Sequence, residues 1–132
     1  MAEYSAIAFF EAYEKYGVTR EQAVHSALKE YRSYYDVYGS VLGRTDTKMT
    51  RALTAFVSEY EYVCLAIDKT VVMLDTLRKA VGDDAFFDGL KTYCKQNLYK
   101  IASVEDFIGA FERVGLDVGG FFESFLQGKA IL

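Results

Sequence analysis

Few side chains in this sequence are of the types that carry out catalysis, and their spacing limits what they can do. His25 is the only histidine and Ser26 follows it, so an H-E-x-x-H zinc helix cannot exist within the chain. A cysteine nucleophile would need a histidine partner, and His25 is the sole candidate for Cys64 or Cys94. We therefore expect His25 to be a surface or boundary residue and both cysteines to be reduced, inert thiols in the core.

Closely spaced carboxylates are the second source of chemistry. Asp83/Asp84 and Glu105/Asp106 stand where helices are expected to begin. Negative charge at a helix N-terminus is stabilised by the helix dipole, so these two pairs are expected to be structural. No glycine-rich phosphate loop accompanies them.

Two further groups of charges interrupt apolar sequence. Glu59 and Glu61 flank Tyr60, and without metal partners we expect them to form a solvated face. Asp68 and Lys69 form a charged pair inside a long apolar stretch that contains no helix breaker.

The elements that position these residues are predicted to be helices. The chain contains no proline, and its apolar residues recur at steps of three and four between capping residues and glycines. We expect an all-α fold, a compact bundle of about six helices in a single domain over residues 1–132. The expected helices cover residues 2–16, 19–43, 48–81, 84–97, 103–115 and 118–127. The third is expected to break between 58 and 62, which leaves a buried helix over 63–81. Asp83 is expected to cap the helix over 84–97, and Asp117 the helix over 118–127.

The periodic residues define the expected inward faces. The tyrosine stripe, Tyr31, Tyr34, Tyr35 and Tyr38, has two readings: a packed helix face, which its helical spacing favours, or the lining of a ligand groove. The other residues expected to face inward are Tyr4, Ile7, Phe10 and Tyr13, then Val24, Leu28 and Leu42, and later Phe87, Leu90 and Cys94.

Composition excludes several classes of function. Net charge is −4 with scattered lysines and arginines, which gives no support for nucleic-acid binding. Hydrophobic residues make up 52% and aromatic residues 16%, enough for an ordered core and for a surface that another chain could cover. Because the sequence has no run of about 20 apolar residues and no signal peptide, we expect a soluble chain of unknown location.

One pattern of residues resembles a known family. It starts with Lys69-Thr70-Val71, Leu74, Leu77-Arg78 and Gly82-Asp83-x-x-Phe86, continues through Leu90, Tyr93, Glu105-Asp106-Phe107 and Phe111-Glu112, and ends with Asp117, Phe121-Phe122 and Phe125-Leu126. In order and spacing over residues 66–126 it resembles the C-terminal part of the catalytic domain of the gluzincin aminopeptidases, the membrane alanyl aminopeptidase family of zinc peptidases. That family reads roughly Y-x-K-G-A-x-x-L-x-x-L-R, G-D-x-x-F, E-D-F and F-F-x-x-W-L. Ala2-Glu3-Tyr4 is similar to the end of its E-G-L-A-E-Y segment.

The resemblance implies where the metal site would lie. The first glutamate of E-G-L-A-E-Y is the family's third zinc ligand, and its position falls before Met1. All three ligands and the general base would therefore lie upstream, so this chain is expected to hold no metal or cofactor of its own, with zinc in a full-length parent. The chain resembles the helical C-terminal portion of a thermolysin-like domain that walls the substrate cleft. The resemblance places the charged pair Asp68-Lys69 at the family's Y-x-K-G turn, which implies that the pair lies at the rim of that cleft.

The sequence also departs from the family pattern. The family's tyrosine that hydrogen-bonds the oxyanion of the tetrahedral intermediate stands two residues before the lysine, and here that position holds Ile67. Tyr62 resembles a second family tyrosine. Thr70 replaces a glycine and Phe125 a tryptophan, changes that are compatible with packing.

Two functions follow as expectations. In the first, this chain is a part of a zinc aminopeptidase-like domain, inactive alone, with no catalytic residue of its own. Its partners would be the upstream zinc-binding half and, in the parent, a peptide substrate. In the second, it is a free-standing, non-enzymatic helical interaction module, and an exposed apolar face would favour a homodimer. The residues expected at the substrate cleft are Tyr62, Asp68, Lys69, Glu59 and Glu3.

Overall fold

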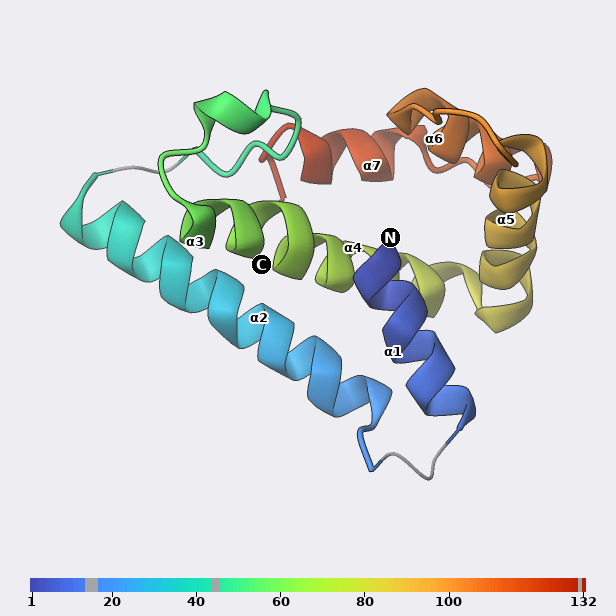
Figure 1. The fold of residues 1–132 in the computed structure, drawn as a ribbon, viewed down its shortest axis with the longest axis horizontal. Coiled ribbons are helices and arrows are strands. Elements are labelled where there is room, and N and C mark those ends of the chain that lie inside the picture. Colours follow the sequence, from blue (N-terminus) through green and yellow to red (C-terminus); the bar gives the residue numbers. More distant parts are fainter. Residues whose placement is uncertain (14–16, 44–45, 131) are drawn as a thin grey trace. The chain divides into compact units, whose positions relative to one another are not determined.

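A computed structural model describes residues 1–13, 17–43, 46–130 and 132, and within them every regular element is helical (Figure 1). The all-α prediction is confirmed, as is the count of about six helices when α3, η4 and α4 are taken as one continuous run. The elements are α1 (Ala2–Ala12), α2 (Arg20–Asp36), η2 (Val37–Val41), η3 (Leu53–Ala55), α3 (Glu59–Tyr62), η4 (Val63–Asp68), α4 (Lys69–Val81), α5 (Asp83–Gln96), α6 (Val104–Arg113) and α7 (Gly119–Leu126).

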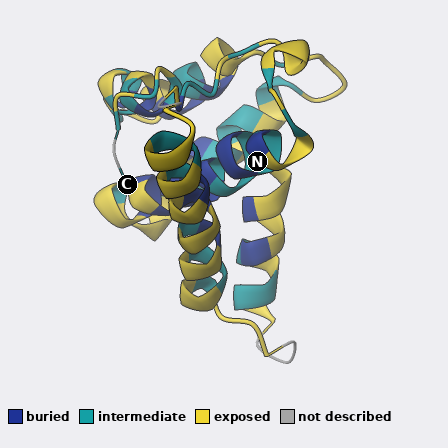
Figure 2. Ribbon diagram, turned by 90° about the vertical axis from the view of Figure 1, so that its left-hand side faces the viewer, coloured by how far each residue is buried: buried dark blue, intermediate teal, exposed yellow. Residues whose placement is uncertain are grey.

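The chain divides into two compact units. The first comprises Met1–Asp75 together with Phe125–Leu132, and the second comprises Thr76–Ser124. The boundaries fall within α4 and α7. Buried and exposed residues alternate along the helices, as amphipathic elements require (Figure 2).

In the first unit, α1 and α2 form where their sequence signals predict, with one difference. Thr19 and Gln22 form the expected capping box at the start of α2. The first helix, however, ends at Ala12 and not at residue 16; residues 14–16 lie outside the described part. Tyr13 leaves the helical conformation (φ −121°, ψ 71°), which takes its ring off the inward stripe and leaves it exposed. Tyr4 and Ile7 are buried as expected.

The second helix changes its geometry near its end. After Asp36 the chain continues as the π-helix η2, and Gly43 then adopts a positive φ of 64°. The wider π turn alters the phase of the apolar stripe, so Leu42, expected inside, is exposed. Of the tyrosine stripe, Tyr31 and Tyr34 are buried.

That stripe is packing, as its spacing favoured. Tyr31 and Tyr34 form a core cluster with Cys64 and Leu65 of η4. Residues packed at the edge of this cluster are Tyr38, Phe56 and Leu132.

The helix expected from Lys48 does not form. Residues 48–52 are irregular. Met49 N–H donates to Leu126 O at 2.9 Å, a tertiary contact, and Arg51 Nε donates locally to Lys48 O at 2.9 Å. The next helix begins at Glu59 because the Ser58 side chain caps it by accepting from Glu61 N–H. From Glu59 the helical run continues through η4 and α4 to Val81. The buried helix, expected over 63–81, therefore starts four residues earlier, within the interval of 58–62 in which a break was predicted.

In the second unit, α5 and α6 pack against each other over an aromatic core. Phe86, Phe107, Phe111 and Phe122 are buried, and their ring centroids lie 5.2–6.1 Å apart in consecutive contacts. Gly89 permits this approach, because a Cβ placed there would lie 2.5 Å from the Phe111 ring.

Three expectations about α5 and one about α7 are corrected. Gly82, with φ 85°, is the N-cap of α5, and Asp83 is the first helical residue, where its carboxylate pairs with Arg78 at 2.8 Å. Phe86 and Gly89 form the buried face, so Phe87 and Leu90 are half-buried and Cys94 is exposed. The last helix starts at Gly119, so Asp117 lies two residues before it. At α6 the expected cap is confirmed, since Ser103 and Asp106 form a capping box.

Candidate functional site

Two of the five expected cleft residues line one cavity in the first unit. Glu3 of α1 and Tyr62 of α3 both border a hollow of about 300 Å³. Met1, Ala2, Ile67 and Thr70 line the same hollow. Residues of α1 and of the run from α3 to α4 therefore line one hollow, although they are far apart in the sequence.

The helix turn that bears Ile67 is irregular. Residues 63–68 form the π-helix η4 between the α-helical segments α3 and α4. Thr70 Oγ1 donates to Ala66 O at 2.7 Å, giving that carbonyl a side-chain partner. Single π turns inside α-helices occur frequently at functional sites, since they redirect side chains without breaking the helix.

Asp68 faces a second, smaller hollow of about 220 Å³. Glu3 and Glu30 line it as well, together with Ser26. Burial raises the pKa of Asp68 to about 6, and the charges of Glu30 and Glu3 add to the rise. Glu3 borders both hollows and so links Asp68 to the cavity at Ile67.

Lys69 does not lie at a cleft rim, and that expectation is wrong. Its side chain has no exposed area. Nζ donates to Thr47 O at 2.9 Å and to Phe125 O at 3.2 Å. The amine is turned inward because carbonyl groups of two other segments converge on it, which sequence spacing cannot reveal.

Glu61 is also buried, so the predicted solvated face holds only for Glu59. Glu61 Oε1 accepts from Tyr34 Oη at 2.8 Å and pairs with Arg51 at 3.3 Å, and Oε2 accepts from Val57 N–H. Burial by itself would raise the pKa of Glu61, but these hydrogen bonds and the Arg51 charge outweigh it and lower the pKa. Glu59 is exposed and contributes nothing to the cavities described above.

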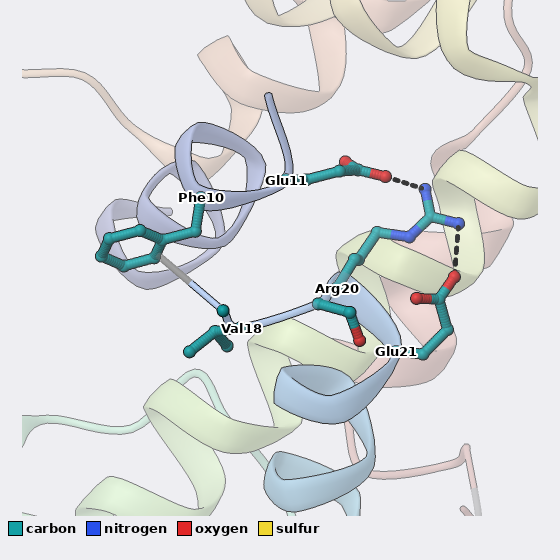
Figure 3. A pocket seen from close by; sticks show the side chains of 7 residues that line it. Phe10, Glu11, Val18, Arg20 and Glu21 are labelled. Atoms are coloured by element: carbon teal, nitrogen blue, oxygen red, sulfur yellow. Dashed lines mark ion pairs between the residues drawn. The ribbon is translucent and has the colours of Figure 1, made fainter. Parts of the chain in front are cut away.

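Arg20 forms a charged cluster that sequence reasoning missed. Figure 3 shows the carboxylates of Glu11 and Glu21 directed at its guanidinium. These residues line a hollow of about 390 Å³ together with Phe10 and Val18. Arg20 Nε also lies 3.4 Å from Asp75, which accepts from Tyr4 Oη at 3.3 Å. The cluster ties α1, α2 and α4 together, and the guanidinium of Arg20 is paired with carboxylates on all three helices.

The remaining reactive side chains are dispersed. His25 is exposed, as expected. Cys64 is buried, and burial raises the pKa of its thiol to about 11, which keeps it protonated at neutral pH. Cys94 is exposed, so the expectation of a core thiol is wrong there.

The described residues do not bring three or more histidine, cysteine, aspartate or glutamate side chains into an arrangement that could hold a metal ion. Within the same ranges, no helix has the length and apolar character needed to cross a membrane.

Comparison with protein-family models, with curated proteins and with solved structures found no match for this chain.

Proposed function

We propose that this chain is the helical C-terminal portion of a zinc aminopeptidase-like catalytic domain. In a full-length parent it would wall the substrate cleft behind the metal. The zinc ligands and the general base would come from the parent's upstream half, so the chain alone would hydrolyse nothing.

One observation carries the proposal: the cavity shared by the N-terminal segment and the turn at Ile67. The resemblance assigns Glu3 and Ile67 to two different motifs of the family's active site, on the basis of sequence alone. The fold brings these positions to one hollow of about 300 Å³, and Tyr62, the second expected cleft residue, lines it too. A chance match of short motifs would not require its members to meet in space.

Ile67 gives the proposal a chemical consequence. A developing oxyanion needs a preorganised hydrogen-bond donor, and loss of one such donor slows catalysis by about 10²–10³-fold. An isoleucine side chain donates nothing. Tyr62 has a phenol, but it lies five residues before Ile67 and so on another helix turn, and its ring packs edge-on against Phe56 at 5.3 Å. The parent is therefore expected to be a slow enzyme or an inactive one.

The test begins with the coding sequence upstream of Met1. The proposal expects an in-frame H-E-x-x-H and a downstream glutamate four positions before Glu3. The complete reading frame should bind one zinc per chain by elemental analysis, whereas the 132-residue chain should bind none. Stoichiometric, tight zinc in the short chain, or an upstream stop codon in place of the motif, would refute the proposal.

Measurements of catalytic activity then test whether Ile67 slows the reaction. The parent and its Ile67→Tyr variant should be assayed with amino-acid anilides, with Ile7→Val, a conservative change in α1, as the control for general damage. Higher turnover in Ile67→Tyr alone supports the assignment of this position. Normal turnover in the unchanged parent would show that Ile67 does not impair the chemistry.

Exposed apolar side chains favour a second candidate, a free-standing helical interaction module. Val41, Leu53 and Val57 in the first unit are 73%, 71% and 63% exposed. Side chains of this kind are stabilised when another chain covers them. Sedimentation of the purified chain at several concentrations checks this: a concentration-dependent dimer together with an upstream stop codon supports the module, and a monomer at all concentrations argues against self-association.

A further inference from the structure

Lys69 is a buried charge without a carboxylate partner. Its side chain is fully buried at the start of α4, and its two hydrogen bonds go to backbone carbonyls, Thr47 O and Phe125 O. Within the described ranges no carboxylate lies within ion-pair distance of Nζ; Asp46 acts on it only from further away. Buried lysines are ordinarily paired, so this arrangement needs an explanation.

The two carbonyls belong to segments that close on each other around the amine. The C-terminal segment, residues 125–130, comprises the last two residues of α7 and the four residues that follow it. Its carbonyls at Leu126 and Gly128 accept from Met49 N–H at 2.9 Å and from Thr47 Oγ1 at 3.2 Å. Lys69 donates to a third carbonyl of the same segment, Phe125 O, which also accepts from Gly128 N–H at 3.2 Å. The C-terminal segment packs closely against residues 47–48, since a Cβ on Gly128 would lie 2.9 Å from Lys48 N.

The number of donors matches the neutral form of the amine. An uncharged amine keeps two N–H groups, enough for Thr47 O and Phe125 O, and carries no charge to desolvate. The ammonium has a third N–H and a full charge that is costly to bury. Burial lowers the pKa of Lys69 from its ordinary value of 10.5 to about 8, while Asp46 acts weakly in the opposite direction.

One other contact opposes this shift, because the face of the Tyr31 ring lies within cation–π range of Nζ and favours the ammonium; the remaining groups do not change the balance. From α2, the Tyr31 ring lies 5.7 Å from Nζ, and burial raises the pKa of Tyr31, so its phenol stays neutral in this range. Asp46, next to Thr47 in the chain, contributes a negative charge that raises the pKa of Lys69, and the C-terminal segment contributes the Phe125 carbonyl as a hydrogen-bond acceptor. Asp68, beside Lys69 in the chain, borders a different hollow with Glu3 and Glu30.

We propose that Lys69 is a proton-sensitive latch: the neutral amine holds the C-terminal segment against residues 47–49, and protonation loosens it. The inference is independent of the proposed function. When the segment leaves, the amine meets water and its proton affinity returns toward the ordinary value. Between about pH 8 and 10.5 the closed form therefore binds fewer protons than the open form, so rising pH favours closure, by up to about tenfold per pH unit. Below about pH 8 both forms are protonated and the bias toward closure is at its weakest.

The experiment uses NMR on the full chain across a pH range that extends from well below 8 to above the ordinary lysine value of 10.5. The ¹³Cε shift of Lys69 reports its protonation, and backbone order parameters of Gly128, Lys129 and Ala130 report closure. We expect Lys69 to titrate well below 10.5 and the order of these residues to rise with the same midpoint. Titration at the ordinary lysine value, or unchanged order across the midpoint, would overturn the proposal without any variant being needed.

Three variants separate charge from packing. Lys69→Arg stays charged at all these pH values, so the segment should be poorly ordered throughout. Lys69→Met carries no proton, so its segment should show no pH-dependent change. Lys29→Met removes an exposed lysine of α2 and should titrate like the unchanged chain. A pH-dependent rise in order that persists in Lys69→Met would refute the role of Lys69.

Discussion

The packing of α5 on α6 allows a prediction in which two glycines of one helix pair respond oppositely to the same change. Gly89 lies within α5 and is buried, and a Cβ there would lie 2.5 Å from two carbon atoms of the Phe111 ring, which has no exposed area. Gly109 lies within α6, and a Cβ there meets nothing within 4 Å. Both positions are helical, so alanine improves helix propensity at each by about 1 kcal/mol.

At Gly89 the gain in propensity is opposed by overpacking. A methyl group forced into a well-packed core costs about 1–3 kcal/mol, because Phe111 cannot withdraw from Phe86 and Phe122 without losing contacts of its own. Gly89→Ala should therefore be neutral to destabilising by about 2 kcal/mol, and Gly109→Ala stabilising by up to about 1 kcal/mol. Because the propensity terms cancel, the difference between the two variants measures the steric term, about 1–3 kcal/mol.

Urea unfolding followed by circular dichroism measures both free energies of unfolding, with the slope required to stay constant. A Phe111→Leu change should reduce the penalty of Gly89→Ala, since the methyl group then has room. The reasoning would be refuted if Gly89→Ala were as stabilising as Gly109→Ala, because the close approach of α5 to Phe111 would then be absent in solution.

Further predictions concern the buried acid and the two thiols. Glu61→Gln should lower the free energy of unfolding at pH 7 by roughly 1–3 kcal/mol, since Arg51 loses its charged partner, whereas the exposed control Glu59→Gln should change it by less than about 0.5 kcal/mol. Because folding lowers the pKa of Glu61, its contribution is present above the ordinary value of 4.5 and is lost as pH falls through the lowered value; acid titration of stability should show this dependence in the unchanged chain and not in Glu61→Gln. Maleimide labelling followed by mass spectrometry should modify Cys94 rapidly and Cys64 only in denaturant, and equal native rates would contradict the burial of Cys64.

The helices could be predicted where the signal is local. The capping boxes at Thr19 and Ser103 lie within four residues of sequence, and both form as expected. Tyr31 and Tyr34 were placed correctly because helical spacing puts them on one face. The error over residues 48–58 has the opposite origin: apolar periodicity there favours a helix, but the backbone of Met49 bonds to Leu126, a partner that lies far along the chain.

The candidate site shows the same division. Residue identity alone established that His25 cannot complete a zinc motif, that Ile67 offers no hydrogen-bond donor, and that Lys69 is a charge within apolar sequence. Whether this chain is a single domain over residues 1–132, and whether it is part of a peptidase, stay predictions.

Only the tertiary structure decided which charges are buried. Glu59 and Glu61 look equivalent in the sequence, yet one is exposed and the other is held by Tyr34, Arg51 and Val57. Lys69 was expected at a rim and lies inside, because the carbonyls of Thr47 and Phe125 meet there. A charge can be buried only where partners from distant segments converge, and that convergence is a property of the folded chain that no local pattern encodes.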